Sequence, residues 1–152
     1  MWCGDRLLVF DAGTGARPLG LSLDEKTSGP FKLDHFFSHT HWDHIVGLPF
    51  FCPAYGKGNE IRIWAGHLLP SSDIEAVLRQ AMTEPLFPVP FDVFHAEISF
   101  QDFTVFNDKD GAPKLDVLNN ALKVKEAKNI NQIHLSISHE KNYAVASVIL
   151  EK

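Results

Sequence analysis

Short apolar and alternating segments along the chain predict several β-strands. Apolar strand segments cover residues 6–10 and 31–37, and residues 61–64 alternate between apolar and polar positions. Alternation of this kind indicates a strand with one covered face. Residues 133–140 and 143–150 predict a final strand pair. Because both faces of residues 143–150 are apolar or small, we expect that strand to be central or covered.

Other segments have the signals of helices. Residues 43–48 are typical of a first helical turn that Pro49 stops. A Ser72–Glu75 capping box predicts the start of a second helix. The apolar face of that helix would consist of Ile74, Val77, Leu78, Ala81 and Met82. A short helix is expected over residues 117–127, and two paired strands are expected on either side of a turn at residues 101–102.

Composition fits an ordinary globular chain. The 152 residues suit a single core, with 45% hydrophobic and 22% charged residues. The net charge of −5 and the lack of a Lys/Arg cluster predict no nucleic-acid partner. Cys3 and Cys52 form no Cys-x-x-Cys pair, which is typical of a reducing compartment. No apolar run of membrane-spanning length or signal peptide occurs, so we expect a cytoplasmic protein without a membrane partner.

The segment His39-Thr40-His41-Trp42-Asp43-His44 carries the strongest chemical signal in the chain. Residues i and i+2 of an extended segment point the same way, so His39 and His41 could share one cation. Asp43 and His44 could reach a second cation nearby. The pattern therefore predicts a metal site with one or two Zn²⁺ ions, and zinc-bound water would supply hydroxide for hydrolysis of an unidentified small molecule. Asp43, the candidate catalytic residue, could orient that hydroxide.

This motif after a hydrophobic strand resembles the signature of the metallo-β-lactamase fold superfamily. Residues 7–15 resemble the family's strand ending in Asp-x-Gly. This resemblance implies that Asp11 stabilises the metal-binding loop without binding the metal itself. The resemblance covers about residues 3–104 and implies half of an αβ/βα sandwich. The family's remaining zinc ligands come from later segments, and no matching segments are found in this chain. The site is therefore short of ligands, and His67 or His139 could complete it.

The chain from about residue 107 onward is similar to a different family. Residues 133–140, which contain Ser136-Ile137-Ser138-His139-Glu140, and the following residues 143–150 resemble the C-terminal end of holo-acyl-carrier-protein synthases, the small 4′-phosphopantetheinyl transferases. That resemblance implies a coenzyme A contact at His139, together with Mg²⁺. The family holds Mg²⁺ with an Asp and with a Glu in a Lys-Glu-Ala helix. Lys125-Glu126-Ala127 lies too close to His139 for that helix, so we interpret it as a coincidence.

Together these patterns predict an α/β (α+β) fold, with a partial metallo-β-lactamase-like half and an added C-terminal strand pair. Residues 1–105 and 106–152 would be the two parts, packed as one unit, with a join near Val105 in a chimeric or truncated chain. The first hypothesis for function is a zinc-type hydrolase with an incomplete site. The alternatives are a phosphopantetheinyl transferase fragment that keeps a coenzyme A contact, or a composite chain without catalysis. Self-association is expected, because half a sandwich leaves one sheet face uncovered.

Overall fold

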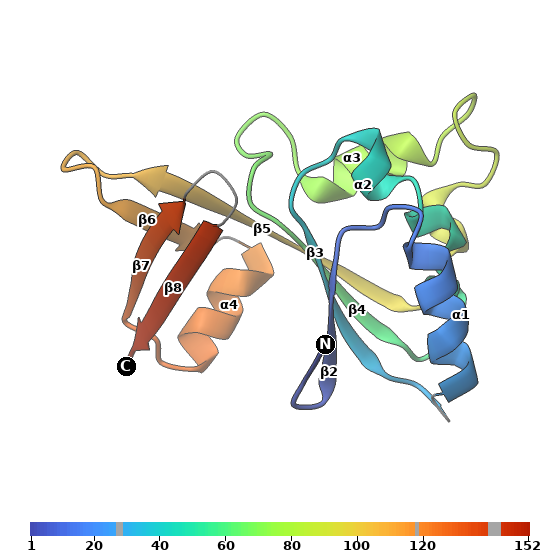
Figure 1. Cartoon of the computed structure of the whole chain (residues 1–152), viewed down its shortest axis with the longest axis horizontal. Helices are drawn as coiled ribbons and strands as arrows, with labels where there is room; N and C mark the ends of the chain where they lie inside the picture. The colour runs from blue at the N-terminus through green and yellow to red at the C-terminus, as the bar shows by residue number, and fades with distance from the viewer. Residues whose placement is uncertain (27–28, 118, 140–143) are drawn as a thin grey trace.

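The computed structural model describes the chain except residues 27–28, 118 and 140–143. It has an α+β fold, as expected, and ends in the anticipated strand pair (Figure 1). The elements in chain order are β1 (Trp2–Cys3), β2 (Arg6–Phe10), α1 (Ala16–Lys26), β3 (Lys32–Phe37), α2 (Trp42–Ile45), η1 (Leu48–Phe50), η2 (Cys52–Tyr55), β4 (Glu60–Ala65), α3 (Ile74–Ala81), η3 (Phe91–Val93), β5 (Glu97–Asn107), β6 (Pro113–Val117), α4 (Asn119–Ala127), β7 (Gln132–His139) and β8 (Ala144–Glu151).

Within the described residues, six strands form one sheet in the order β1-β2-β3-β4-β5-β6. The central pairs β2·β3, β3·β4 and β4·β5 are parallel, whereas β1 and β6 pair antiparallel with their neighbours at the two ends. Strands β7 and β8 form a separate antiparallel hairpin. Figure 1 shows α1 beside the parallel strands and α4 with the hairpin at the opposite end of the molecule.

Strand β5 is continuous where the sequence predicted a turn at residues 101–102. Its residues 97–102 pair with β4, and its residues 103–107 pair with β6. Gln101 and Asp102 are each only 3% exposed. Asp102 accepts a hydrogen bond from the backbone N–H of Ile74 at 3.1 Å, so this polar side chain is satisfied inside the protein and requires no solvent-facing turn. The predicted turn was therefore wrong.

The amphipathic helix was predicted correctly, although its cap lies one residue beyond the predicted one. α3 begins at Ile74, and the side chain of Asp73 caps it by accepting a hydrogen bond from the Ala76 N–H at 2.8 Å. Asp73, rather than Ser72, is thus the capping residue. Ile74, Leu78 and Met82, three members of the predicted apolar face, are at most 2% exposed.

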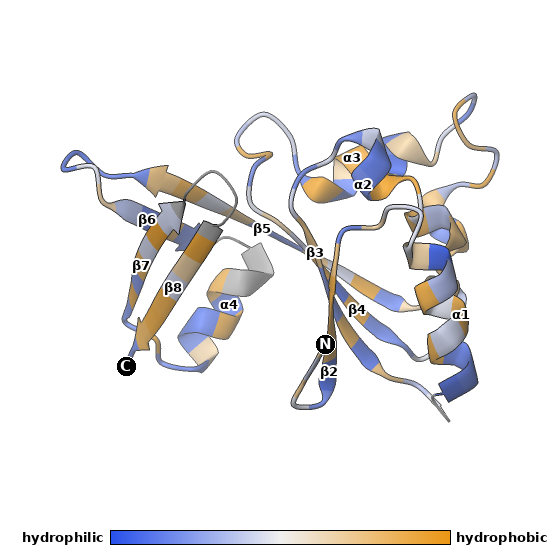
Figure 2. Cartoon of the chain, in the orientation of Figure 1, coloured by the Kyte–Doolittle hydropathy of each residue, from blue (hydrophilic) through white to orange (hydrophobic). Residues whose placement is uncertain are grey.

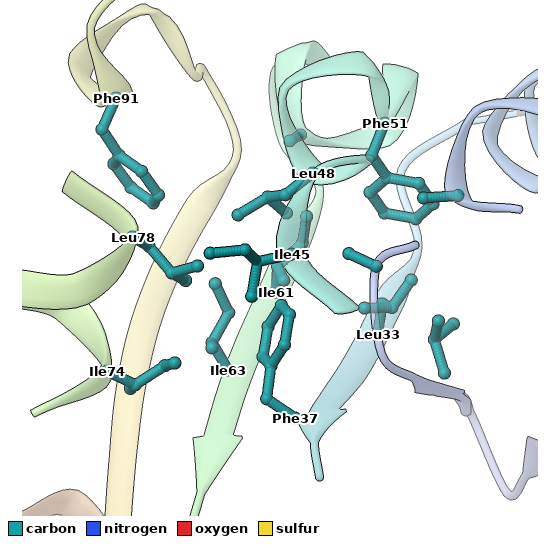
Figure 3. Close-up of a cluster of buried hydrophobic side chains, with 14 of the residues drawn as sticks. Leu33, Phe37, Ile45, Leu48, Phe51, Ile61, Ile63, Ile74, Leu78 and Phe91 are labelled. Carbon is teal, nitrogen blue, oxygen red and sulfur yellow. The ribbon is translucent and has the colours of Figure 1, made fainter. Parts of the chain in front are cut away.

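One face of the parallel sheet supplies the core. Side chains from β2, β3 and β4 alternate into it and meet those of α3 and of the segment that follows α2 (Figure 3). The labelled members of this cluster are Leu33, Phe37, Ile45, Leu48, Phe51, Ile61, Ile63, Ile74, Leu78 and Phe91. Burial of such side chains contributes about 1.5–3 kcal/mol each before the entropic terms are counted, so this cluster holds the N-terminal part together.

A charged network occupies the opposite side of the same strands. The carboxylate of Asp34, which is 4% exposed, accepts hydrogen bonds from Arg6 Nε and Arg62 Nη2, both at 2.7 Å, and from Trp64 Nε1 at 3.1 Å. Burial raises the pKa of Asp34, but the hydrogen bonds from Arg62, Trp64 and Arg6 outweigh it and lower the pKa overall. A buried carboxylate with several donors remains ionised and links three neighbouring strands.

His35 is a fully buried imidazole at the centre of the sheet. Its Nε2–H donates to the carbonyl oxygen of Asp11 at 2.9 Å, and Nδ1 has no hydrogen-bond partner. The ring stacks on Phe37, with centroids 4.8 Å apart, and contacts Phe51 edge-on. Burial lowers the pKa of His35 from 6.5 to about 4, so the folded protein holds this imidazole in its neutral form.

The buried imidazole makes stability depend on pH. Since His35 takes up a proton below about pH 6.5 only when unfolded, its stabilising contribution is complete above that pH and is lost as the pH falls toward 4. We expect His35 to account for a loss of about 2 kcal/mol in unfolding free energy between about pH 7.5 and pH 5. Urea titrations at both pH values should show this drop reduced in His35→Gln and retained in the exposed-residue control His134→Gln. An equal drop in His35→Gln would contradict the assignment.

Strand β8 differs from the sequence prediction. We expected it to be central or covered, but its apolar side chains are exposed on both faces. Val145 and Ile149 are 65% and 64% exposed on one face, and Val148 and Leu150 are 50% and 55% exposed on the other. Figure 2 shows hydrophobic colouring along this strand, next to β7. The apolar pattern was therefore real, but nothing described in this chain covers it.

Among the described helices, none has the length and hydrophobicity needed to span a lipid bilayer.

Candidate functional site

The histidine segment starts in the loop after β3 and continues into α2, and the loop after β2 packs against it. The backbone N–H of Ala12 donates to the carbonyl of His44, and the N–H of Gly47 donates to the carbonyl of Ala12, both at 2.6 Å. A side chain at Gly47 would overlap the carbonyl oxygen of Gly13. The absence of a side chain there lets the loop after β2 approach α2 closely.

Asp11 connects the two loops through its carboxylate. One carboxylate oxygen accepts the Ser38 N–H at 2.8 Å, and the other contacts His44 Nδ1 at 3.0 Å. The hydroxyl of Ser38 also donates to this carboxylate. Burial raises the pKa of Asp11, but the hydrogen bonds from His44 and Ser38 more than offset this and lower the pKa overall. Asp11 adopts a positive φ of 55°, a conformation that Asp and Asn tolerate better than most residues.

Three imidazoles gather beside this carboxylate. The ring centroids of His39 and His41 are 4.6 Å apart, and those of His39 and His44 are 3.8 Å apart. His67, from the loop after β4, lies within 3.4 Å of the Thr40 hydroxyl through Nε2. Burial, followed by the proximity of His39, lowers the pKa of His67. The structure thus brings His67 to the cluster that the sequence predicted.

The imidazoles converge, but they do not form a metal site. No group of three or more His, Cys, Asp or Glu side chains among the described residues is arranged to hold a metal ion. Both ring nitrogens of His44 face carboxylates, with Nδ1 at Asp11 and Nε2 3.3 Å from Asp43. His39 Nδ1 lies 3.0 Å from the Ser38 hydroxyl, and its ring packs against that of His44.

The prediction of a zinc-binding hydrolase is corrected by this arrangement. Asp43, the proposed catalytic carboxylate, has a side chain that is 79% exposed and contacts His44 rather than a shared centre. Hydrogen bonds among Asp11, Ser38, His39 and His44 instead form a polar corner where the segments after β2 and β3 meet α2. The His41 ring packs against that of His39, and Asp43 lies at the exposed rim of this corner.

The second candidate position, His139, is the last residue of β7. Its backbone pairs with that of Ala144 at the end of the β7–β8 register. The structure thus places it inside the strand expected over residues 133–140, at the C-terminal end of β7. Its side chain lies outside the described part of the chain. Further along the hairpin, His134 Nε2 contacts Glu151 Oε2 at 3.0 Å across the two strands.

Asp102, which the sequence predicts to lie in a turn, is instead a buried carboxyl group. A cavity of about 590 Å³ lies beside α3, and its lining includes Asp102, Arg79 and Phe91. Burial raises the pKa of Asp102, and the hydrogen bond from the Ile74 N–H offsets part of that rise. Arg79 is already paired there with Glu75 at 2.8 Å and Asp92 at 2.7 Å. Asp102 lies two and four residues after Phe100 and Ile98, on the same strand face, and that spacing was the available signal for its burial.

Comparison with known proteins supports the second resemblance. The chain is similar to holo-[acyl-carrier-protein] synthases of Aliivibrio fischeri (strain MJ11), Vibrio campbellii and Vibrio parahaemolyticus, with 46%, 48% and 50% identity over 54 residues. Each match covers 36% of this chain and 43% of the relative, so the chain spans less than half the length of these relatives. No family model matches the chain. These relatives are named as synthases, which is the second reason that the hydrolase prediction was wrong.

The polar corner can be tested through Asp11. Asp11→Asn keeps a side chain that tolerates the positive φ but removes the charge that attracts the His44 and Ser38 donors. We expect it to lower the unfolding free energy by about 1–2 kcal/mol and to speed hydrogen exchange of the Ser38 amide. Asp43→Asn, at an exposed carboxylate, is the matched control and should change stability by less than about 0.5 kcal/mol. Equal effects of the two substitutions would show that Asp11 does not hold the corner.

Proposed function

We propose that residues 106–152 are a 4′-phosphopantetheinyl-transferase-type segment, and that the chain binds coenzyme A through His139. The observation that carries this proposal is the identity of 46–50% over 54 residues with holo-[acyl-carrier-protein] synthases. Acyl carrier protein, which those relatives name, is the protein partner that we propose. The proposal concerns binding, because more than half of each relative's length has no counterpart in the match.

The described geometry supports placing the contact at one end of the hairpin. Strands β7 and β8 pair over eight residues each, from Gln132↔Glu151 to His139↔Ala144. At about 3.4 Å per residue, His139 is roughly 24 Å from the opposite end of β7. The family resemblance assigns the coenzyme A contact to the histidine next to the strand connection, and His139 occupies that place in this fold.

An imidazole at this place can donate a hydrogen bond to a phosphate or pyrophosphate oxygen, and a charged acceptor strengthens that bond. Coenzyme A carries several such oxygens. His134 contacts the side chain of Glu151 at the other end of the hairpin, where the carboxylate would repel phosphate. The two histidines of β7 therefore differ in what they can offer an anionic ligand.

The resemblance implies Mg²⁺, held by an Asp and a Glu, alongside coenzyme A. No group of three or more candidate ligands comes together in the described part of the chain, so no Asp and Glu pair is assigned to the ion. Glu126 is exposed near the end of α4, in the tripeptide interpreted as a coincidence. We therefore propose no transfer step for this chain, only the coenzyme A contact.

Coenzyme A titrated into the full chain tests this function by isothermal calorimetry and by the NMR signals of the histidine side chains. We expect binding that shifts the His139 resonances and an affinity that falls by about tenfold or more in His139→Ala, because a charge-assisted hydrogen bond is removed.

His134→Ala is the matched control, since it removes an imidazole from the same strand and should leave the affinity within about twofold. No binding by the unmodified chain, or an equal loss in both variants, would exclude the assigned contact. No binding at all would favour the third hypothesis, a composite chain without this function.

A further inference from the structure

The cavity beside α3 has no part in the function proposed above. Its lining comes from α3, from η3 with the residues that follow it, and from β5, and its volume of about 590 Å³ is typical of small-molecule sites. Four carboxylates and one guanidinium belong to this lining, so three negative charges have no counterpart within it. An excess of negative charge in a concave site favours a cationic ligand. The charged lining residues are Asp73, Glu75, Arg79, Asp92 and Asp102.

Asp102 is the buried carboxylate of this lining, with only 3% of its surface exposed. Its Oδ1 accepts the Ile74 N–H at 3.1 Å, and within the described residues this is the only hydrogen bond of the side chain. The second oxygen, Oδ2, therefore receives no donor from the described part of the protein. A buried carboxylate with so few donors is costly unless another group compensates its charge.

The carboxylate of Asp34, in the same sheet, shows what is missing at Asp102. Asp34 is buried to nearly the same degree, but it accepts hydrogen bonds from two arginines and from Trp64. Those donors lower the pKa of Asp34, whereas burial raises the pKa of Asp102 and the nearby charges of Asp73 and Glu75 raise it further. Asp102 thus has the burial of a paired carboxylate without an arginine or lysine donor in the described structure.

Arg79 does not supply the missing charge, because its guanidinium is already engaged. Nε donates to Glu75 at 2.8 Å, and Nη1 donates to Asp92 at 2.7 Å. Its Cζ lies 5.1 Å from the ring centroid of Phe91. The guanidinium therefore compensates two carboxylates nearer the surface, and Asp102 remains open to a cation from outside the chain.

Aromatic rings form the apolar part of the lining, and they narrow the class of cation. The ring centroid of Phe91 lies 4.9 Å from that of Phe94 and 5.7 Å from that of Phe100. Such a wall packs against methylene groups, and aromatic faces attract ammonium ions. One free carboxylate oxygen suits a compact ammonium group better than a guanidinium, which favours both oxygens of a carboxylate. A metal ion fits less well, because no three candidate ligands among the described residues are arranged to hold one.

We propose that this cavity binds a linear diamine or polyamine. One ammonium group donates to Oδ2 of Asp102, and the methylene chain lies along Phe94 and Phe100. A second ammonium group meets the remaining negative charge beside Asp73, at the start of α3. Since the cavity is built entirely by α3, η3 and β5 with their adjoining residues, this site is independent of the coenzyme A contact at His139.

Calorimetric titration of the full chain with the diamine putrescine tests the site. We expect saturable binding, a loss of affinity of about tenfold or more in Asp102→Asn, and a change within about twofold in Glu97→Gln. Asn keeps an oxygen for the Ile74 N–H but removes the charge. Glu97→Gln is the matched control, because it removes an exposed carboxylate of the same strand that does not line the cavity. No binding by the unmodified chain, or an equal loss in the two variants, would overturn the proposal.

A comparison of ligands tests the assignment without any substitution. A diol with the same carbon chain as putrescine carries no charge, so it should not bind at concentrations at which putrescine saturates the cavity. Putrescine should also shift the backbone amide NMR signals of Ile74 and Phe100 and leave that of His134 in place. Equal binding of the diol, or shifts confined to residues outside the lining, would show that the cavity is not an ammonium site.

Discussion

The backbone pairing of β5 is the constraint on which the rest of the structure depends. The first part of the strand, residues 97–102, pairs parallel with β4 and so extends the sheet of β2, β3 and β4. The second part, residues 103–107, pairs antiparallel with β6. Helix α4 packs against β5 and β6, and β7 follows it. Asp102, buried and bonded to the first residue of α3, fixes the strand where the two kinds of pairing meet.

This constraint explains how sequence segments with two different resemblances share one sheet. The expected join near Val105 lies inside β5, where residues 103–107 pair with β6 instead of forming a linker. The core cluster covers one face of the parallel strands, while the C-terminal hairpin remains open on both faces. Strand β8 therefore keeps apolar side chains exposed that the described part of the chain does not cover.

Sequence periodicity correctly predicted the strands and the helix that depend on local interactions. The strand at residues 6–10, the helix at Ile74 and the final strand pair follow from periodicity, because burial of one face specifies each of them. Longer-range contacts decided the rest. Burial of Asp102 against α3 removed the expected turn, and the carboxylates of Asp11 and Asp43 placed beside both nitrogens of His44 left a motif with metal-ligand spacing as a hydrogen-bonded corner. Spacing identifies which residues meet, but the direction of each imidazole depends on such neighbours.

Native-state hydrogen exchange along β5 tests most directly whether one strand unites the chain. The account predicts that the hydrogen-bonded amides of residues 97–102 and those of residues 103–107 open with the same free energy and the same denaturant dependence, as one cooperative unit. Protection that stops after Asp102, with the amides of residues 103–107 exchanging at the rate of an unstructured peptide, would contradict it.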